Sequence, residues 1–262
     1  MNDYPIGIFD SGVGGTSIWK EIKKLLPNEG TIYLADSKHA PYGEKSQAEI
    51  IKLSVKNTDL LLNQGCKLVV VACNTATTNA IDYLRENYQV PFIGIEPAIK
   101  PAALRTNSKT VGVLATKGTL SSSLFNSTSE IYARGIKIIE KEGAGLVPLI
   151  EQGKVESNEM RSLLQELIYP MLEEGIDCLV LGCTHYPYLI PVLRELLPEH
   201  VQIIDSGTAV ARQTKAVLEM HELGNISDIK AKHRFFTNAD VAILKGFLKD
   251  TNPSVQTDYL DF

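Results

Sequence analysis

Two cysteines occupy matching positions in a repeated stretch of the sequence. Residues 65–73 (GCKLVVVAC) align without a gap to residues 175–183 (GIDCLVLGC). Each stretch has the apolar run of a buried parallel strand, so Cys73 and Cys183 are expected where two equivalent strands end. The shorter match between 6–9 (IGIF) and 111–114 (VGVL) is no better than chance for two such strands. The longer match predicts two α/β halves of similar topology.

Two thiols at equivalent places of facing halves suit one class of reaction. One group removes a proton from a tetrahedral carbon while the other delivers a proton to the opposite face, which inverts the stereocentre. A free thiol has a pKa of about 8.5, so either cysteine can act as acid or base near neutral pH. Cys73 precedes polar residues that open a helix (NTATT), and a helix N-terminus favours thiolate. The same arrangement is expected at Cys183.

Two titratable residues stand beside these cysteines. Asp10 follows the first strand and His185 follows Cys183, and neither has a titratable counterpart in the other half. We therefore pair Asp10 with Cys73 and His185 with Cys183, as groups that tune the thiols. Taken alone, Asp10 also fits a helix N-cap and His185 a structural histidine. Their place next to the paired cysteines favours the catalytic interpretation.

The strand-to-helix turns also carry groups that can bind a carboxylate. Ligands of open parallel sheets bind beyond the carboxyl ends of the strands, where these turns converge. Hydroxyl, amide and backbone groups in the turns can donate hydrogen bonds to a substrate. The candidates for substrate contacts are Asp10, Ser11, Pro41, Tyr42, Gly43, Asn74, Thr75, Thr119, Thr184 and His185.

The elements that position these residues alternate between short β-branched runs and helical patterns. Seven runs are predicted to be buried parallel strands: PIGIF, TIYLA, LVVVA, PFIGI, TVGVLA, CLVLG and VQIID. Between them, apolar residues from Ile18 to Leu26 form a helix face that ends at Pro27, and Ser46 with Glu49 makes a capping box. The alternation predicts two similar doubly wound α/β domains with mainly parallel sheets, related by a pseudo-twofold axis, with the active site in the cleft between them.

The domain boundaries are expected at two crossings of the chain. Pro97 and Pro101 bracket a short connector, and a second crossing is expected between Thr208 and Arg212. The first α/β domain would then contain residues 1–97 and 212–262, so that the tail rejoins the first half. The second α/β domain would contain residues 98–211.

Other kinds of site remain open at this point. The sequence DSGVGG after the first strand resembles the phosphate-binding turn of a dinucleotide site, and Asp36 stands where a ribose-binding carboxylate is expected. Against this, Ser17 occupies the third glycine position, and Asp10 would lie near the pyrophosphate charge. A zinc site made of the paired cysteines and the histidine has an unusual spacing and no evident fourth ligand, so no metal is predicted. A non-catalytic binder of an acidic ligand is the third alternative.

Composition argues against several further functions. The chain has 262 residues, a net charge of -5 and no long run of lysine or arginine, so no nucleic-acid partner is expected. The apolar segment near the N-terminus stops at Asp10, far short of a signal peptide or a membrane span, so we expect a cytoplasmic protein without a membrane partner. The four cysteines are expected to be free thiols, with Cys66 and Cys178 as buried residues outside the site.

Four motifs together resemble one enzyme family. DSGVGG begins at Asp10, PYG spans Pro41 to Gly43, ACNTAT surrounds Cys73 and GCTHYP surrounds Cys183. With this combination the chain resembles the glutamate racemases, from its first strand to about residues 205–207. ACNT and GCTH taken singly are also similar to aspartate racemases of the same superfamily. The resemblance implies a cofactor-independent, two-base interconversion of L- and D-glutamate for bacterial peptidoglycan, with aspartate or another acidic amino acid as the alternative substrate.

The same resemblance implies roles for individual residues. Cys73 and Cys183 become the acid/base thiols, and Asp10 and His185 become their assistants. Glu151, in PLIEQGK, matches an auxiliary carboxylate of the family, although the pattern fits a solvent-facing glutamate nearly as well. The family also implies glutamate as the small-molecule partner and a homodimer as the assembly. The segment after residue 212 carries no motif.

Overall fold

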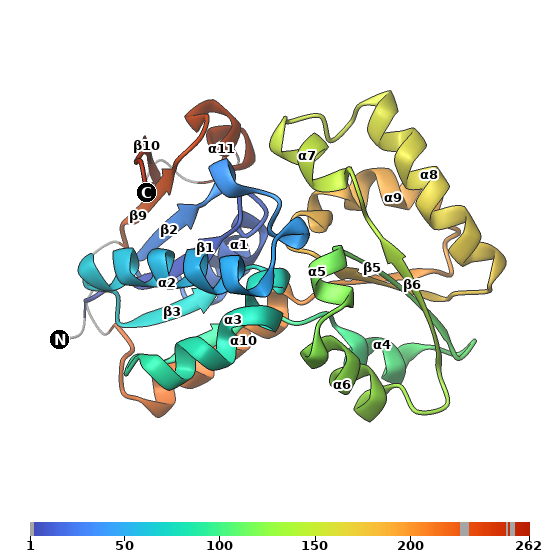
Figure 1. Cartoon of the computed structure of the whole chain (residues 1–262), viewed down its shortest axis with the longest axis horizontal. Coiled ribbons are helices and arrows are strands. Elements are labelled where there is room, and N and C mark those ends of the chain that lie inside the picture. The colour runs from blue at the N-terminus through green and yellow to red at the C-terminus, as the bar shows by residue number, and fades with distance from the viewer. Residues whose placement is uncertain (1–2, 226–230, 250, 252–254) are drawn as a thin grey trace.

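Two parallel β-sheets stand side by side in the protein, each covered by helices on both faces (Figure 1). The computed structural model describes residues 3–225, 231–249, 251 and 255–262. Within these residues the first sheet has the order β10-β9-β2-β1-β3-β4 and the second the order β6-β5-β7-β8. All neighbouring strands are parallel. The first sheet contains β1 (Ile6–Asp10), β2 (Thr31–Ala35), β3 (Leu68–Val71), β4 (Phe92–Gly94), β9 (His233–Thr237) and β10 (Val255–Tyr259), and the second contains β5 (Thr110–Ala115), β6 (Lys137–Glu142), β7 (Cys178–Gly182) and β8 (Gln202–Ile204).

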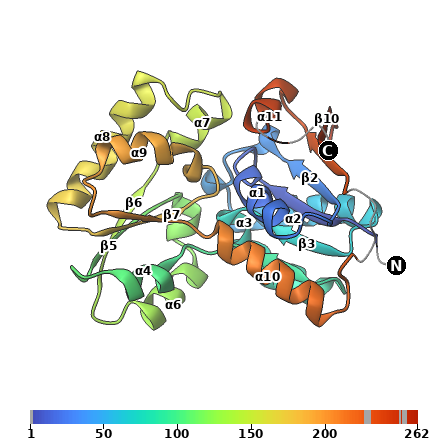
Figure 2. The same cartoon turned by 180° about the vertical axis from the view of Figure 1, so that it is seen from behind.

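The helices divide between the two sheets, and each sheet with its helices is called a unit: the first unit contains the six-stranded sheet and the second the four-stranded sheet. Seen from behind, α10 lies along the first sheet, where it packs against α1 (Figure 2). The helices of the first unit are α1 (Thr16–Leu25), α2 (Gln47–Asn63), α3 (Asn74–Asn87), α10 (Gly207–Met220) and α11 (Val241–Phe247), with the short helices η1 (Ser37–His39) and η2 (Tyr42–Glu44). The helices of the second unit are α4 (Ile99–Arg105), α5 (Lys117–Leu120), α6 (Ser123–Tyr132), α7 (Leu146–Glu151), α8 (Asn158–Glu173) and α9 (Ile190–Leu196), with the short helix η3 (Tyr186–Leu189).

The repeat in the sequence is also a repeat in the fold. The order β2-β1-β3-β4 in the first sheet matches β6-β5-β7-β8 in the second, so β3 and β7 are equivalent strands. The glycine that opens each repeat follows the end of a helix and has a positive φ, 78° at Gly65 and 77° at Gly175. A side chain is strained in that conformation, which explains why glycine stands at both places. The predicted α/β fold with two similar parallel sheets is confirmed.

All seven predicted strands are present, and so are the predicted helix ends. α1 ends at Leu25, just before Pro27, and the Ser46 side chain accepts a hydrogen bond from the Glu49 N–H in a complete capping box. Three strands were not predicted. β6 lies at a sheet edge and has a polar sequence, KIIEKE, while β9 and β10 extend the first sheet beyond β2.

The two predicted crossings differ in detail from the structure. Pro101 lies in the first turn of α4 rather than outside it, a position that tolerates proline because its missing N–H has no helical partner there. The second expected boundary, at residue 212, falls inside α10. The division of the chain into domains at residues 97 and 212 therefore remains a prediction.

The tail of the chain is fixed to the first sheet by a buried aromatic cluster. Trp19 of α1 packs edge-on against Phe235 of β9, with ring centroids 4.7 Å apart. Its indole N–H donates to the Thr31 hydroxyl at 2.9 Å, and that hydroxyl lies 2.9 Å from the His233 ring. These contacts hold β9 beside β2.

No helix among the described residues is long and apolar enough to cross a membrane.

Candidate active site

Both predicted catalytic cysteines line one small pocket between the two sheets. The pocket is narrow, and the two cysteines are more than nine-tenths buried. Cys73 follows β3 in the first unit, and Cys183 follows β7 in the second, as the repeat predicts. The residues around the pocket are Ser11, Pro41, Tyr42, Gly43, Cys73, Asn74 and Thr75 from the first unit and Thr116, Val147, Cys183 and His185 from the second.

Cys73 caps the N-terminus of α3. Its Sγ accepts a hydrogen bond from the Ala76 N–H at 3.4 Å and lies 3.6 Å from the Ser11 hydroxyl. Burial nevertheless raises the pKa of Cys73 well above its usual value, and the charge of Asp10 raises this pKa further, while the contacts with Ala76 and Ser11 lower it. The helix N-terminus therefore does not by itself make Cys73 a thiolate, because desolvation outweighs it.

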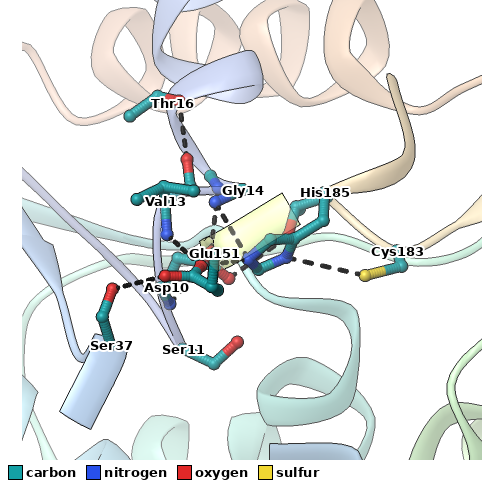
Figure 3. A network of polar contacts seen from close by, with 12 residues as sticks. Asp10, Ser11, Val13, Gly14, Thr16, Ser37, Glu151, Cys183 and His185 are labelled. Atoms are coloured by element: carbon teal, nitrogen blue, oxygen red, sulfur yellow. Dashed lines mark hydrogen bonds and ion pairs between the residues drawn. The ribbon is translucent and has the colours of Figure 1, made fainter. Parts of the chain in front are cut away.

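Cys183 belongs to a chain of three side chains that runs through His185 to Glu151 (Figure 3). Its Sγ lies 3.7 Å from Nδ1 of His185, and Nε2 of the same ring lies 2.5 Å from Oε1 of Glu151. Burial lowers the pKa of His185, but the hydrogen bonds to Cys183 and Glu151 and their charges raise it well above its usual value. Burial raises the pKa of Glu151, and the hydrogen bonds from His185, Val13 and Ser37 lower it below its usual value.

The raised pKa favours the imidazolium form of His185, in which both ring nitrogens carry a proton. The Nε2–H donates to Glu151, and the Nδ1–H is available to the Cys183 sulfur. The Gly14 N–H lies 3.3 Å from Nε2, but it cannot donate to a nitrogen that already carries a proton, so this contact is only a close approach. One prediction differs in detail here: the first helical turn after Cys183 begins at Tyr186 and is the 3-10 helix η3, so Cys183 is not an N-cap.

Asp10 is fully buried, and its hydrogen bonds go to residues other than Cys73. Its Oδ2 accepts hydrogen bonds from the Gly12 and Gly15 N–H groups at 3.2 and 2.9 Å, and its Oδ1 accepts one from the Thr184 hydroxyl at 3.2 Å. Burial raises the pKa of Asp10 to about 6, against the lowering effects of the His185 charge and the Gly15 N–H. Asp10 therefore influences Cys73 by charge, while its hydrogen bonds hold the glycine loop and Thr184.

The glycine loop after β1 makes room for side chains of the second unit. A Cβ on Gly12 would lie 2.0 Å from Oε1 of Glu151, and a Cβ on Gly14 would lie 2.2 Å from Nδ1 of His185. Glycine is required at both places because these side chains approach the backbone itself. The space in which a dinucleotide site would hold its pyrophosphate is therefore filled by Glu151 and His185, which argues against that alternative.

Asn74 lines the pocket and has a polar side chain without a partner among the described residues. Its Oδ1 and Nδ2 atoms are buried, and neither has a hydrogen-bond partner in that part of the chain. Beside it, the Thr75 hydroxyl lies 2.8 Å from that of Thr116. Buried polar atoms in proteins are nearly always paired, so an unpaired amide facing a cavity indicates a place for a polar ligand.

Other predicted contact residues lie around the pocket in different ways. The Thr119 hydroxyl is fully buried and contacts Thr75 at 3.3 Å and Thr116 at 3.1 Å, so it supports the pocket wall from behind. The sequence interpretation missed Thr116, although a signal existed: it follows β5 as Ser11 follows β1. Thr184 bonds to Asp10 and does not line the pocket.

Tyr42 lines the pocket, so its predicted contact with substrate remains a prediction, but its hydroxyl is already engaged elsewhere. The hydroxyl donates to Oδ2 of Asp36 at 2.5 Å. Asp36 is fully buried and also contacts the His39 ring, Lys56 and Asn238. Tyr42 lines the pocket with the rest of its side chain, between Pro41 and Gly43. Asp36 therefore belongs to the support of the pocket wall rather than to a ribose-binding site.

The match to known proteins agrees with this geometry. The family model for Asp/Glu/hydantoin racemases matches residues 6–214. The chain belongs to this family. A glutamate racemase of Ectopseudomonas mendocina is 48% identical over 245 residues, which cover 93% of each chain. The racemase match thus includes both cysteines and all the candidate site residues of this chain.

Solved structures of family members have the same fold. The glutamate racemase isoform RacE1 of Bacillus anthracis superimposes with a TM-score of 0.89 and 29% identity, covering 100% of this chain and 99% of the other. The glutamate racemase of Escherichia coli, solved in complex with L-glutamate and the activator UDP-MurNAc-Ala, superimposes with a TM-score of 0.87 and 35% identity, covering 98% of each chain. The arrangement of two sheets is thus that of experimentally determined glutamate racemases.

Proposed function

We propose that this protein interconverts L- and D-glutamate by two-base proton transfer, with Cys73 and Cys183 as the acid and base. One observation carries the proposal: the two thiols come from equivalent strands of two different sheets and line the same pocket. A substrate in that pocket has one thiol supplied by each unit. Glutamate racemases match nearly the whole chain at 35% to 48% identity, which favours glutamate over aspartate.

Each thiol has a separate source of assistance. The imidazolium of His185 places an N–H and a positive charge beside the Cys183 sulfur, where they can balance a thiolate. Cys73 has the Ser11 hydroxyl and the Ala76 N–H near its sulfur, against the opposing charge of Asp10. The α-ammonium group of a bound amino acid adds positive charge to the same pocket, so substrate binding favours the Cys73 thiolate.

Proton transfer by the thiols is only part of the rate enhancement. A positioned acid or base contributes roughly 10²- to 10⁴-fold, which is too little for the weakly acidic α-proton of an amino acid. Hydrogen-bond donors to the substrate carboxylate supply the remainder by stabilising the charge that develops when the proton leaves. The unpaired amide of Asn74 and the hydroxyls of Ser11 and Thr75 are the donors we assign to this role.

The test uses proton exchange in D₂O without added cofactor. The wild-type protein, given either enantiomer of glutamate, should form the other enantiomer with deuterium at Cα. Cys73→Ala and Cys183→Ala should each reduce inversion on the order of 10³-fold or more, because one face has lost its acid/base group. The remaining thiol can still exchange the α-proton of the enantiomer that it faces, so the two variants should exchange opposite enantiomers.

The matched control is Cys178→Ala, which removes a buried thiol that lies in β7 and outside the pocket. It should leave inversion and exchange unchanged. Inversion by either pocket variant at the wild-type rate, or exchange of the same enantiomer by both, would exclude the two-base assignment. A requirement for a nicotinamide nucleotide, or faster inversion of aspartate than of glutamate, would exclude the proposed substrate chemistry.

The remaining expectations concern the cellular setting. We propose that the enzyme acts in the cytoplasm, where it supplies D-glutamate for peptidoglycan, and that it forms a homodimer. Support comes from the resemblance to glutamate racemases along most of the chain. Sedimentation of the purified protein checks the assembly, since a monomer of 28.8 kDa and its dimer differ twofold in mass.

A further inference from the structure

Glu151 reaches from the second unit to the first, and both of its carboxylate oxygens are held there (Figure 3). The Val13 N–H, in the glycine loop, donates to Oε1 at 2.7 Å. The Ser37 hydroxyl, in η1, donates to Oε2 at 2.8 Å. Oε1 also receives the Nε2–H of His185 at 2.5 Å. Glu151 thus joins the two units at the point where it holds the histidine.

The donors are divided unequally between the two oxygens. Oε1 has two donors, whereas Oε2 has only Ser37 among the described residues. Glu151 is the last residue of α7, where a negative charge is not favoured by the helix and depends on such donors. The last torsion of a glutamate side chain is broad, so a carboxylate held at one oxygen alone can tilt about that contact. The Val13 N–H holds Oε1, and the Ser37 hydroxyl, which holds Oε2, fixes the tilt of the carboxylate plane that faces His185.

We propose that Ser37 is a positioning residue for the His185–Cys183 pair, acting through Glu151. Ser37 belongs to the first unit, while Glu151, His185 and Cys183 belong to the second. The pair is therefore correctly placed only when the two units are in contact at this point, which makes its geometry dependent on their closure. The catalytic consequence rests on the proposed racemisation, but the positioning itself does not and can be measured in the free protein.

The first test is NMR of the protein labelled with ¹⁵N at its histidines. The chain has five histidines, so only a few ring signals have to be assigned. In the wild type, His185 should give a low-field Nε2–H proton signal, assigned by its loss in His185→Asn. Ser37→Ala should move this signal towards higher field or broaden it, because the Val13 N–H then holds the carboxylate at Oε1 alone and its plane can tilt. Ser37→Thr keeps a hydroxyl and should restore the signal.

The matched control is Asn79→Ala. The Asn79 side chain also crosses between the units, where its amide N–H donates to the Gly118 carbonyl at 3.2 Å, and it contacts neither Glu151 nor His185. It should leave the His185 signal in place. An unchanged signal in Ser37→Ala, or an equal shift in Asn79→Ala, would overturn the proposal, since the histidine would then not respond specifically to the Ser37–Glu151 contact.

The second test is steady-state kinetics with glutamate. Ser37→Ala should lower kcat about threefold to tenfold, with KM nearly unchanged. Hydrogen bonds that orient a metal-binding histidine from outside contribute about 10- to 100-fold, and a smaller effect is expected for a histidine that assists a thiol. Ser37→Thr should recover most of the activity. If the signal of His185 responds as expected but the wild type does not racemise glutamate, the positioning role stands and the proposed function fails. If kcat of Ser37→Ala equals that of the wild type in an active enzyme, the positioning role is wrong.

Discussion

Replacement of Asp10 by asparagine should make the protein more stable at neutral pH and less active. Asp10 is fully buried, and burial raises its pKa from 3.8 to about 6. Asparagine has nearly the same shape without the charge. Its oxygen can accept from the Gly12 and Gly15 N–H groups, and its NH₂ group can donate to the Thr184 hydroxyl, which accepts in turn.

The sign follows from the two pKa values of Asp10. The folded protein binds this proton more tightly than the unfolded chain, so the contribution of Asp10 to stability is fully present below about pH 4 and is lost as the pH rises through about 6. The difference between 3.8 and about 6 corresponds to about 3 kcal/mol above pH 7. The pKa of about 6 already includes the hydrogen bonds that stabilise the ionised carboxylate. A gain of about 3 kcal/mol for Asp10→Asn is therefore expected at about pH 8.

The assay is urea unfolding of both proteins at about pH 4.5 and about pH 8. The difference in the free energy of unfolding between variant and wild type should increase by about 2 kcal/mol between these two conditions. A difference that stays constant with pH would refute the reasoning, because the ionised carboxylate would then not be the source of the penalty. Racemase activity of the variant should fall about 100-fold or more, since the negative charge of Asp10 raises the pKa of Cys73 and so makes its thiolate a stronger base towards the α-proton.

Two further predictions concern the glycine loop and a helix cap. Gly12→Ala places a Cβ 2.0 Å from Oε1 of Glu151, so it should lower activity about 10- to 100-fold in the racemase assay. Gly246→Ala has open space around its Cβ and should have no effect on activity. Equal activity of the two variants would contradict the close approach of Glu151 to Gly12. Ser46→Ala removes the capping box of α2 and should reduce the free energy of unfolding, measured by denaturant unfolding, by about 1 kcal/mol. The racemase assay should give an unchanged kcat. A loss of activity at full stability would show that this cap has another role.

The sequence predicts the central part of both sheets because those strands are buried on both faces. Short runs such as LVVVA are apolar and β-branched at nearly every position, which is typical of strands that are buried on both faces. The repeat ending in Cys73 and Cys183 identifies equivalent strand ends. The edge strands were missed for the opposite reason. β6 contains only half-buried and exposed residues and carries four charges in six residues, so nothing in its composition distinguishes it from a loop.

The candidate site could be predicted only to the level of strand ends. The turn after each strand identified Asp10 and His185, but the sequence gives no measure of the distance between turns of different units. The sequence around Glu151 therefore fits a surface glutamate nearly as well as the auxiliary carboxylate that the family resemblance implies, and nothing in it marks Ser37, although both contact the same histidine network. The sequence likewise does not reveal that the Tyr42 hydroxyl has Asp36, from another turn, as its partner.

The order of the strands along the chain also affects how the protein is made. Every strand of the second sheet, from β5 to β8, is synthesised as one continuous segment, whereas the first sheet needs β9 and β10 from the other end of the chain. During translation the second unit can complete its pairing while β2 still has an open edge. That edge waits for the last strands to leave the ribosome, and until then it is the part of the nascent chain most exposed to aggregation and to capture by chaperones.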